Sequence, residues 1–158
     1  YEITARASSA GGASTLTHGV EVVCFWWLTI DFDDVNWDVS PGQADTVLGD
    51  LDPTTPDAPT VTNAGNAPLD VGVELSPLTT PDGGSEIDSF SGTVDDTTLP
   101  IPASDVTWFG TAVCPDDSVA LDLTIFVDSA TEPGDYSGQY TGWGRGAPGP
   151  ACEPAGES

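Results

Sequence analysis

The sequence predicts an all-β protein, folded as an antiparallel sandwich or barrel. Two observations lead to this fold class. Stretches with the 3.6-residue period of an amphipathic helix do not occur. Instead, short runs rich in Thr, Val and aromatic residues alternate with turn residues, and the 158-residue chain holds 18 Gly and 14 Pro. Because 38% of the residues are hydrophobic, with five Trp, five Phe and three Tyr, we expect one domain with a buried core.

The first elements follow from local patterns. Residues 1–7 alternate apolar and polar side chains and predict a half-buried strand, and residues 8–14, rich in Ser, Gly and Ala, predict a flexible connector. Residues 20–32 are apolar on both faces in their middle, which predicts a central strand covered on both sides, with Cys24 as a small buried residue. Residues 35–39 alternate again and stop at a Ser-Pro-Gly turn.

The remaining elements are separated by turn chemistry. Residues 43–59, with three prolines, predict a long loop. We expect strands over 60–62, 67–75, 86–94, 106–113, 119–127 and 136–143, of which 86–94 lies at an edge and 106–113 pairs with 119–127 as a hairpin. The predicted organisation is a strand and connector over 1–14, a sandwich over 15–143 and a Gly/Pro-rich tail over 144–158.

The charge balance restricts the environment and the partners. The chain has 26 acidic residues, two arginines and no lysine, for a net charge of -24. Evenly spread acids would lie about 17 Å apart, well beyond a Debye length of about 8 Å, so the near-absence of cations is the stronger indication. It favours a protein of a high-salt environment or one bathed in divalent cations, and the alternative is an ordinary acidic secreted protein. Binding to nucleic acid or to anionic membrane surfaces is excluded, because both require Lys and Arg.

Membrane insertion is not predicted either. The longest apolar run, residues 20–30, contains Glu21 and is too short to span a bilayer. The chain begins at Tyr1 without a signal-peptide pattern, so we expect a processed product.

Three motifs carry a family resemblance. They read VNWDVSPG at 35–42, TVTNAGNAPLDV at 60–71 and EPGDYSGQY at 132–140. These motifs resemble those of secreted Ig-like domains in archaeal and bacterial surface and filament proteins, among them the bundling pilins of archaea and TasA-like biofilm fibre proteins. The resemblance implies an Ig-like or jelly-roll-type antiparallel β-sandwich with an extended N-terminal strand.

The same resemblance implies a function at the cell surface. The expected role is a structural subunit of an extracellular filament, in which the N-terminal strand of one copy is added to the sandwich of the next. Tyr1, Ile3 and Ala5 would then fill the groove of the neighbouring copy, and the partner is the protein itself. The alternative is a monomeric cell-surface module that binds calcium or a glycan, in which the N-terminal strand folds back on its own sheet.

The three cysteines leave one unpaired within the chain or engaged between chains. The predicted strand order places Cys114 and the start of the tail at the same end of the fold. We therefore expect a Cys114–Cys152 disulfide that fixes the tail, and the alternative is three free thiols. A zinc site is not expected, since His18 is the only histidine and there is no Cys-x-x-Cys motif.

Catalytic residues are not expected. The acidic clusters give no sign of a carboxyl with a raised pKa, and His18 lies in no nucleophile motif. No cofactor is required, and calcium is the candidate ligand, with Asp31, Asp33 and Asp34 as oxygen donors. Against this stands an ordinary solvated acidic face, because Val35 occupies a position where a calcium loop has Asp or Asn.

The tryptophans allow two interpretations. Trp26, Trp27, Trp37 and Trp108 could form a platform for sugars, but within strands such residues belong more often to the core, which we favour. Trp27 and Trp143 are the residues that we expect at an interface.

Overall fold

The computed structural model describes residues 2–9, 12–19, 24–31 and 34–147, and within these ranges it contains strands and no helix. Every strand pairing is antiparallel. The strands form separate sheets that do not close into a barrel, so the prediction of an all-β antiparallel sandwich is confirmed. The described residues include no helix of a length and hydrophobicity that could cross a membrane.

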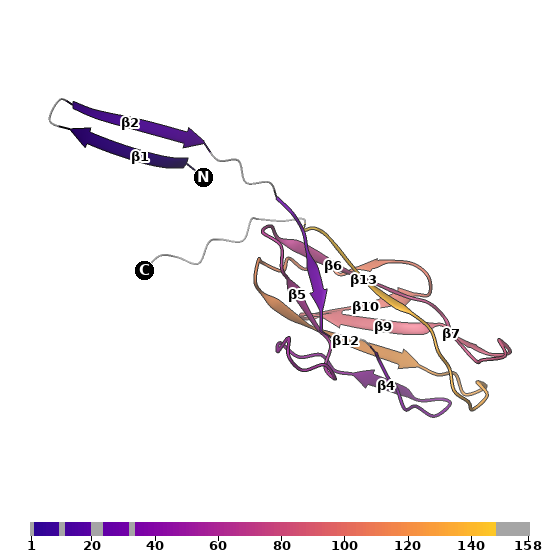
Figure 1. Cartoon of the computed structure of the whole chain (residues 1–158). Coiled ribbons are helices and arrows are strands. Elements are labelled where there is room, and N and C mark those ends of the chain that lie inside the picture. The colour runs from indigo at the N-terminus through magenta and orange to yellow at the C-terminus, as the bar shows by residue number, and fades with distance from the viewer. Residues whose placement is uncertain (1, 10–11, 20–23, 32–33, 148–158) are drawn as a thin grey trace.

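Two sheets form the layers of the sandwich (Figure 1). One has the order β10-β9-β12-β5-β3, with β4 as a further partner of β12, and the other has the order β11-β6-β13. The strands of the first sheet are β3 (Leu28–Ile30), β4 (Ala44–Val47), β5 (Thr60–Asn63), β9 (Ser89–Val94), β10 (Thr97–Pro102) and β12 (Ser118–Phe126). Those of the second are β6 (Leu69–Leu75), β11 (Thr107–Trp108) and β13 (Tyr140–Gly146). A small two-stranded sheet joins β7 (Leu78–Thr79) to β8 (Glu86–Ile87).

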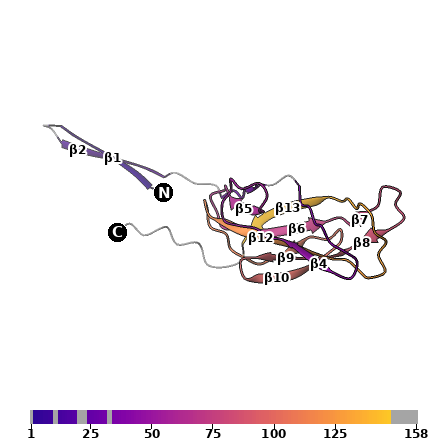
Figure 2. The same cartoon turned by 90° about the horizontal axis from the view of Figure 1, so that it is seen from below.

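The core lies between these layers, which Figure 2 shows nearly edge-on. Along β12 the side chains alternate, and those of Leu121, Leu123 and Ile125 are at most 1% exposed. In β6 the inward residues are also aliphatic, whereas Asp70, Gly72 and Glu74 lie on the outer face. Alternation with a period of two is what places one set of side chains in the core and the other outside.

A buried asparagine explains the turn after β5. Asn63 is fully buried, and its amide nitrogen donates to the carbonyl oxygens of Ala67 and Val113, both at 2.9 Å. Its side-chain oxygen accepts a hydrogen bond from the Gly65 N–H at 2.9 Å. The TNAGN motif therefore forms a turn whose polar side chain is fully paired inside the fold.

Glycines close one side of the sandwich. Gly142, Gly144 and Gly146 alternate along β13 and lie on its core-facing side, opposite Val73, Val71 and Leu69. A Cβ atom at Gly142 would lie 2.2 Å from Cδ1 of Ile30, and one at Gly144 would lie 2.7 Å from Cδ1 of Leu69. Since side chains of β3 occupy this space, only glycines permit the two layers to approach so closely here.

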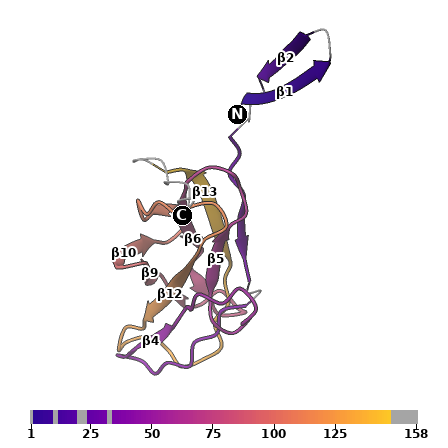
Figure 3. The ribbon, with the colours of Figure 1, turned by 90° about the vertical axis from the view of Figure 1, so that its left-hand side faces the viewer.

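The N-terminal segment is a hairpin rather than a single extended strand. Strand β1 (Glu2–Ser9) pairs with β2 (Gly12–Gly19) over their whole length. In all three views the hairpin lies apart from the sandwich (Figures 1, 2 and 3). The connector expected over 8–14 is therefore wrong for residues 8, 9 and 12–14, which belong to the two strands.

Three further predictions about strands are wrong. The segment predicted as a central strand forms only β3, which lies at the end of its sheet, and Cys24 is exposed; residues 20–23 and 32–33 lie outside the described residues. Residues 106–113 and 119–127 form no hairpin, because β11 and β12 belong to different layers. Strand β9 is not an edge strand, because β10, which the sequence patterns missed, covers it.

Candidate functional site: an open groove

A groove of about 940 Å³ opens at one edge of the sandwich. It is lined by two chain segments, residues 34–41 and 131–142, and by buried core side chains between them. These core residues are Leu75, Ile87, Ile125 and Val127, each at most 7% exposed. The volume lies at the upper end of the range for small-molecule pockets, and the exposed lining is more polar than apolar because the core residues at its floor are almost covered.

The first segment is extended but unpaired. Val35, Trp37 and Val39 alternate with exposed residues and pack against the core. Trp37 fixes the segment, since its Nε1 donates to the carbonyl oxygen of Leu123 at 3.0 Å and its ring lies 6.4 Å from that of Phe90. Between 34 and 39, the backbone makes one hydrogen bond within the described chain, from the Asp38 N–H to Asp45 Oδ2 at 3.2 Å. This segment thus has the side-chain pattern of a strand without a ladder.

The second segment leads into a terminal strand. Ser137 and Thr79 exchange two backbone hydrogen bonds of 3.0 and 2.9 Å, and the Tyr136 hydroxyl donates to the Glu132 carbonyl at 2.8 Å. Strand β13 then pairs with β6 and ends the order of its sheet. Since a strand bonds its neighbour through alternate residues, the other edge of β13 presents backbone groups to the outside.

The charged residues of the groove are all acidic. Its acidic lining residues are Asp34, Asp38, Glu132 and Asp135, and the lining contains no Lys, Arg or His. Anionic ligands are therefore disfavoured. An extended peptide is a suitable ligand, because its backbone can bond to the backbone of residues 34–39, which makes one hydrogen bond within the described chain.

The residues predicted to enter such a groove lie in the hairpin. In the β1–β2 ladder, Ile3 is the partner of His18 and Ala5 that of Leu16. Tyr1 lies outside the described residues. Whether these three residues contact a neighbouring copy stays a prediction.

The predicted calcium ligands are not brought together within the described chain. Asp31 accepts a hydrogen bond from the Thr60 N–H at 2.8 Å, and its Oδ2 is buried without a partner. Asp34 is exposed at the groove, and Asp33 lies outside the described residues. The residues that the structure describes contain no group of three His, Cys, Asp or Glu side chains suited to a metal ion.

The cysteines divide into two kinds. Cys24 is a free, exposed thiol, whereas Cys114 is disulfide-bonded. Cys152 lies outside the described residues, so the described part of the chain contains no complete pair and the Cys114–Cys152 link stays a prediction.

The tryptophans are more exposed than we expected. Trp37 packs on the core, but Trp26 and Trp27 are 52% and 61% exposed, and Trp143 is 44% exposed. The core interpretation is thus wrong for Trp26 and Trp27, while the exposure of Trp27 and Trp143 agrees with residues available for an interface.

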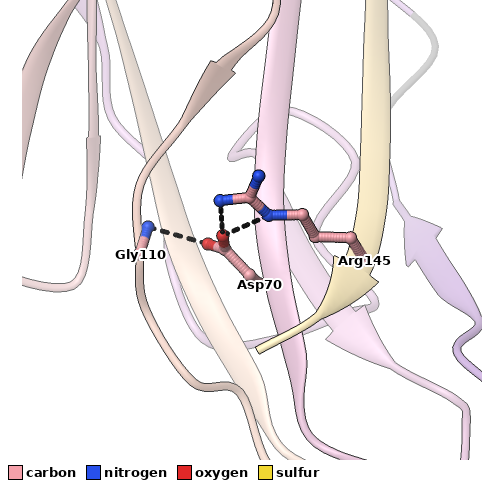
Figure 4. A network of polar contacts seen from close by, with 3 residues as sticks. All are labelled: Asp70, Gly110 and Arg145. Atoms are coloured by element: carbon pink, nitrogen blue, oxygen red, sulfur yellow. Dashed lines mark hydrogen bonds and ion pairs between the residues drawn. The ribbon is translucent and has the colours of Figure 1, made fainter. Parts of the chain in front are cut away.

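The sequence patterns missed an ion pair on the outer face of the second sheet (Figure 4). Asp70 is fully buried, and its Oδ2 accepts from Nε of Arg145 at 2.9 Å and lies 2.8 Å from a terminal guanidinium nitrogen. Its Oδ1 accepts from the Gly110 N–H at 2.7 Å. The guanidinium carbon lies 4.1 Å from the ring centroid of Trp108. Arg145 therefore neutralises a buried carboxylate and holds an aromatic ring across three strands.

Fold and groove together define an antiparallel β-sandwich with an open, acidic groove at one edge. Comparison with models of known protein families, with curated proteins and with solved structures finds no match for this chain.

Proposed function

We propose that this protein is a structural subunit of an extracellular filament, in which the N-terminal hairpin of one copy adds to the open groove of the next. The observation that carries the proposal is the hairpin itself, two eight-residue strands that pair with each other and lie apart from the sandwich. A two-stranded hairpin alone is at best marginally stable in water. Docking against another copy would supply the missing third strand and the apolar cover.

The groove supplies the complementary surface. It combines buried aliphatic residues with two flanking segments: residues 34–39, whose backbone makes one hydrogen bond within the described chain, and β13, which ends its sheet. Strand addition uses such edges for main-chain hydrogen bonds and alternate pockets for side chains. On this proposal Ile3 and Ala5, together with Tyr1, enter the groove from one side of the added strand. The added strand also covers edges that would otherwise promote aggregation.

The charge supports cohesion of this kind. At -24, with two arginines, copies of the chain have almost no cations with which to form salt bridges to each other. Backbone pairing and apolar burial remain effective at high salt, where charge repulsion is screened. The protein would thus assemble at the cell surface in a salt-rich medium, with itself as partner and without a catalytic role.

The test compares Ile3→Asp with the matched control Thr4→Asp in the full chain. Both variants add one acidic residue to β1, but only the first changes a residue that we assign to the groove. We expect wild type and Thr4→Asp to form filaments in negative-stain images at high salt and Ile3→Asp to remain monomeric. Filaments of Ile3→Asp equal to those of wild type would contradict the proposal, as would a wild type that never assembles.

A second candidate function, a monomeric cell-surface module that binds a neutral glycan, is favoured by the outer face of β6. Trp108 and Trp143 are both ladder partners of Gly72, so they flank a position without a side chain. Trp143 Nε1 donates to Glu74 Oε2 at 3.0 Å, which fixes this half-exposed ring beside a carboxylate. An aromatic surface with polar neighbours is suited to stacking and hydrogen bonding with sugars. Retention on a neutral polysaccharide that Trp143→Ala abolishes would support this function, and equal elution of both proteins would exclude it. Calcium is the less favoured ligand, given the dispersed carboxylates.

A further inference from the structure

Three consecutive aromatic residues are exposed where the chain enters the sandwich. Phe25, Trp26 and Trp27 are 49%, 52% and 61% exposed, and we call them the aromatic cluster. With about 150–250 Å² of surface for each aromatic side chain, the three residues together expose roughly 200–400 Å². Phe25 and Trp27 share one face of the extended segment and account for roughly 160–280 Å² of this area, while Trp26 lies on the other face.

The cluster has a fixed backbone. The Phe25 N–H donates to Asn66 Oδ1 at 2.8 Å, and the Phe25 carbonyl accepts from the Asn66 N–H at 3.1 Å. The Trp27 carbonyl accepts from the Ala64 N–H at 2.8 Å. A Cβ atom at Gly65 would lie 2.5 Å from the Phe25 carbonyl oxygen, so the close approach of the two segments requires a glycine.

One ring of the cluster is also supported from below. A Cβ atom at Gly146 would lie 2.8 Å from Cζ2 of Trp26, so this ring covers the end of β13. Phe25 and Trp27 alternate with Trp26 along the extended segment, so they lie together on its opposite face, on the same side as the exposed Thr29. A preorganised apolar surface loses little conformational entropy when a partner covers it.

Chain connectivity restricts what can cover the cluster. Strand β2 ends at Gly19, six residues before Phe25, and six residues span at most about 20 Å. Wherever the hairpin docks, the aromatic cluster must lie within that distance of it. If the hairpin occupies the groove of a neighbouring copy, the cluster lies at the junction between the two copies.

We propose that the aromatic cluster packs against the copy of this chain that receives the hairpin. The inference rests on the proposed function and adds to it a second contact, outside the groove. Copies with a net charge of -24 repel each other and have almost no cations for salt bridges. The aromatic cluster is uncharged, so the attraction that it provides is not screened by salt. The hairpin then sets which copies associate, and the aromatic cluster stabilises the junction.

The first test is the double variant Phe25→Ser/Trp27→Ser, which retains Trp26 on Gly146. The control is Leu48→Ser/Leu51→Ser, which removes apolar residues that are 65% and 68% exposed. These leucines lie in the loop before β5, near Thr60 and Asp31, at the opposite end of β3 from the cluster. We expect the aromatic variant to raise the critical concentration for assembly at least about tenfold and the control to leave it within about twofold.

The free thiol of Cys24 provides a second readout in the wild-type chain. It is exposed and adjacent to Phe25. We expect maleimide to label Cys24 at least about tenfold more slowly in wild-type filaments than in monomeric Ile3→Asp. This measurement needs no change in the cluster, so it decides the question even if the double variant does not fold.

The outcomes separate the two proposals. A wild type that forms no filaments, or an Ile3→Asp variant that forms them, overturns the proposed function. If wild type assembles and Ile3→Asp does not, the inference fails when Cys24 remains as reactive in the filament as in the monomer. It also fails when the folded aromatic variant assembles at the wild-type concentration.

Discussion

The hairpin and the sandwich are built from the same kind of strand but differ in what covers them. In the sandwich, β12 has ladder partners on both edges, and its inward side chains are almost completely buried. In the hairpin, β1 and β2 have each other, and the figures show them apart from the sandwich. Strands that lack a third neighbour are marginally stable. The sandwich thus has a covered core within one chain, whereas on the proposed function the hairpin gains its third strand from a neighbouring copy.

The largest expected effect is a difference in stability between a substitution in the sandwich and one in the hairpin. Leu123→Ala removes a fully buried side chain from β12 and should lower the free energy of unfolding of the monomer by about 2–5 kcal/mol. Leu16→Ala, in β2, should change it by less than about 0.5 kcal/mol, because the hairpin lies apart from the core. Chemical denaturation below the assembly concentration measures both values. Equal losses would mean that the hairpin is part of the folded sandwich, and would contradict the difference between the two regions.

The next effect concerns the ion pair between Asp70 and Arg145, which links β6 to β13. Arg145→Met leaves the buried carboxylate of Asp70 without its cation, although water can enter where the half-exposed arginine stood. We expect a loss of about 1–3 kcal/mol in the free energy of unfolding. Adding Asp70→Asn removes the unpaired charge and should recover part of this loss. If Arg145→Met is as stable as wild type, the ion pair does not hold β13 on β6.

A similar loss is expected where β3 and β13 approach each other. Gly142→Ala places a Cβ atom 2.2 Å from Cδ1 of Ile30, so the Ile30 side chain must change its rotamer or β3 must move away from β13, at a cost of about 1–3 kcal/mol. Gly134→Ala is the control, because its Cβ would meet nothing nearer than 3.9 Å. Thermal unfolding of both variants tests the difference. An unchanged melting temperature for Gly142→Ala would show that Ile30 accommodates the added methyl group without cost.

The smallest effect is electrostatic and lies in a surface turn. The side-chain hydrogen bond from Thr80, helped by the Gly84 N–H, lowers the pKa of Asp82 below its ordinary value. A carboxyl with a lowered pKa in the folded state contributes stability above its unfolded pKa, and this contribution disappears as the pH falls through the folded pKa. Thr80→Val should therefore move the pKa of Asp82 upward, as NMR titration can measure. A titration identical to that of wild type would exclude the hydrogen bond as the cause.

The sequence predicted the layers better than the edges. Strands β5, β6 and β12 were found because Thr, Val and Leu alternate between clear turns, such as the one that Asn63 closes. Strand β10 was missed because Pro100 and Pro102 are unusual in a ladder, yet it lies at an edge, where proline is tolerated. Which strands become neighbours depends on long-range packing, so the supposed hairpin of 106–113 with 119–127 could not be distinguished from two strands in different layers.

The candidate site was predictable only in part. The alternation at 35–39 indicated a strand and correctly identified Val35, Trp37 and Val39 as the side chains that pack on the core. No local pattern could show that the backbone of this segment pairs with no neighbouring strand of the described chain. The exposure of Phe25 and Trp26 was missed for a related reason. An apolar run indicates burial, and only the fold shows that β3 ends a sheet and that no described strand covers these rings.

Hydrogen exchange of the backbone amides in β1 and β2 can decide whether the hairpin is completed by a neighbouring copy. We expect rapid exchange of residues 2–9 and 12–19 in the dilute monomer, slow exchange of β12 in both states, and strong protection of the hairpin in the assembled protein. Hairpin amides that exchange as fast after assembly as before, or that are already as protected as β12 in the dilute monomer, would contradict this expectation.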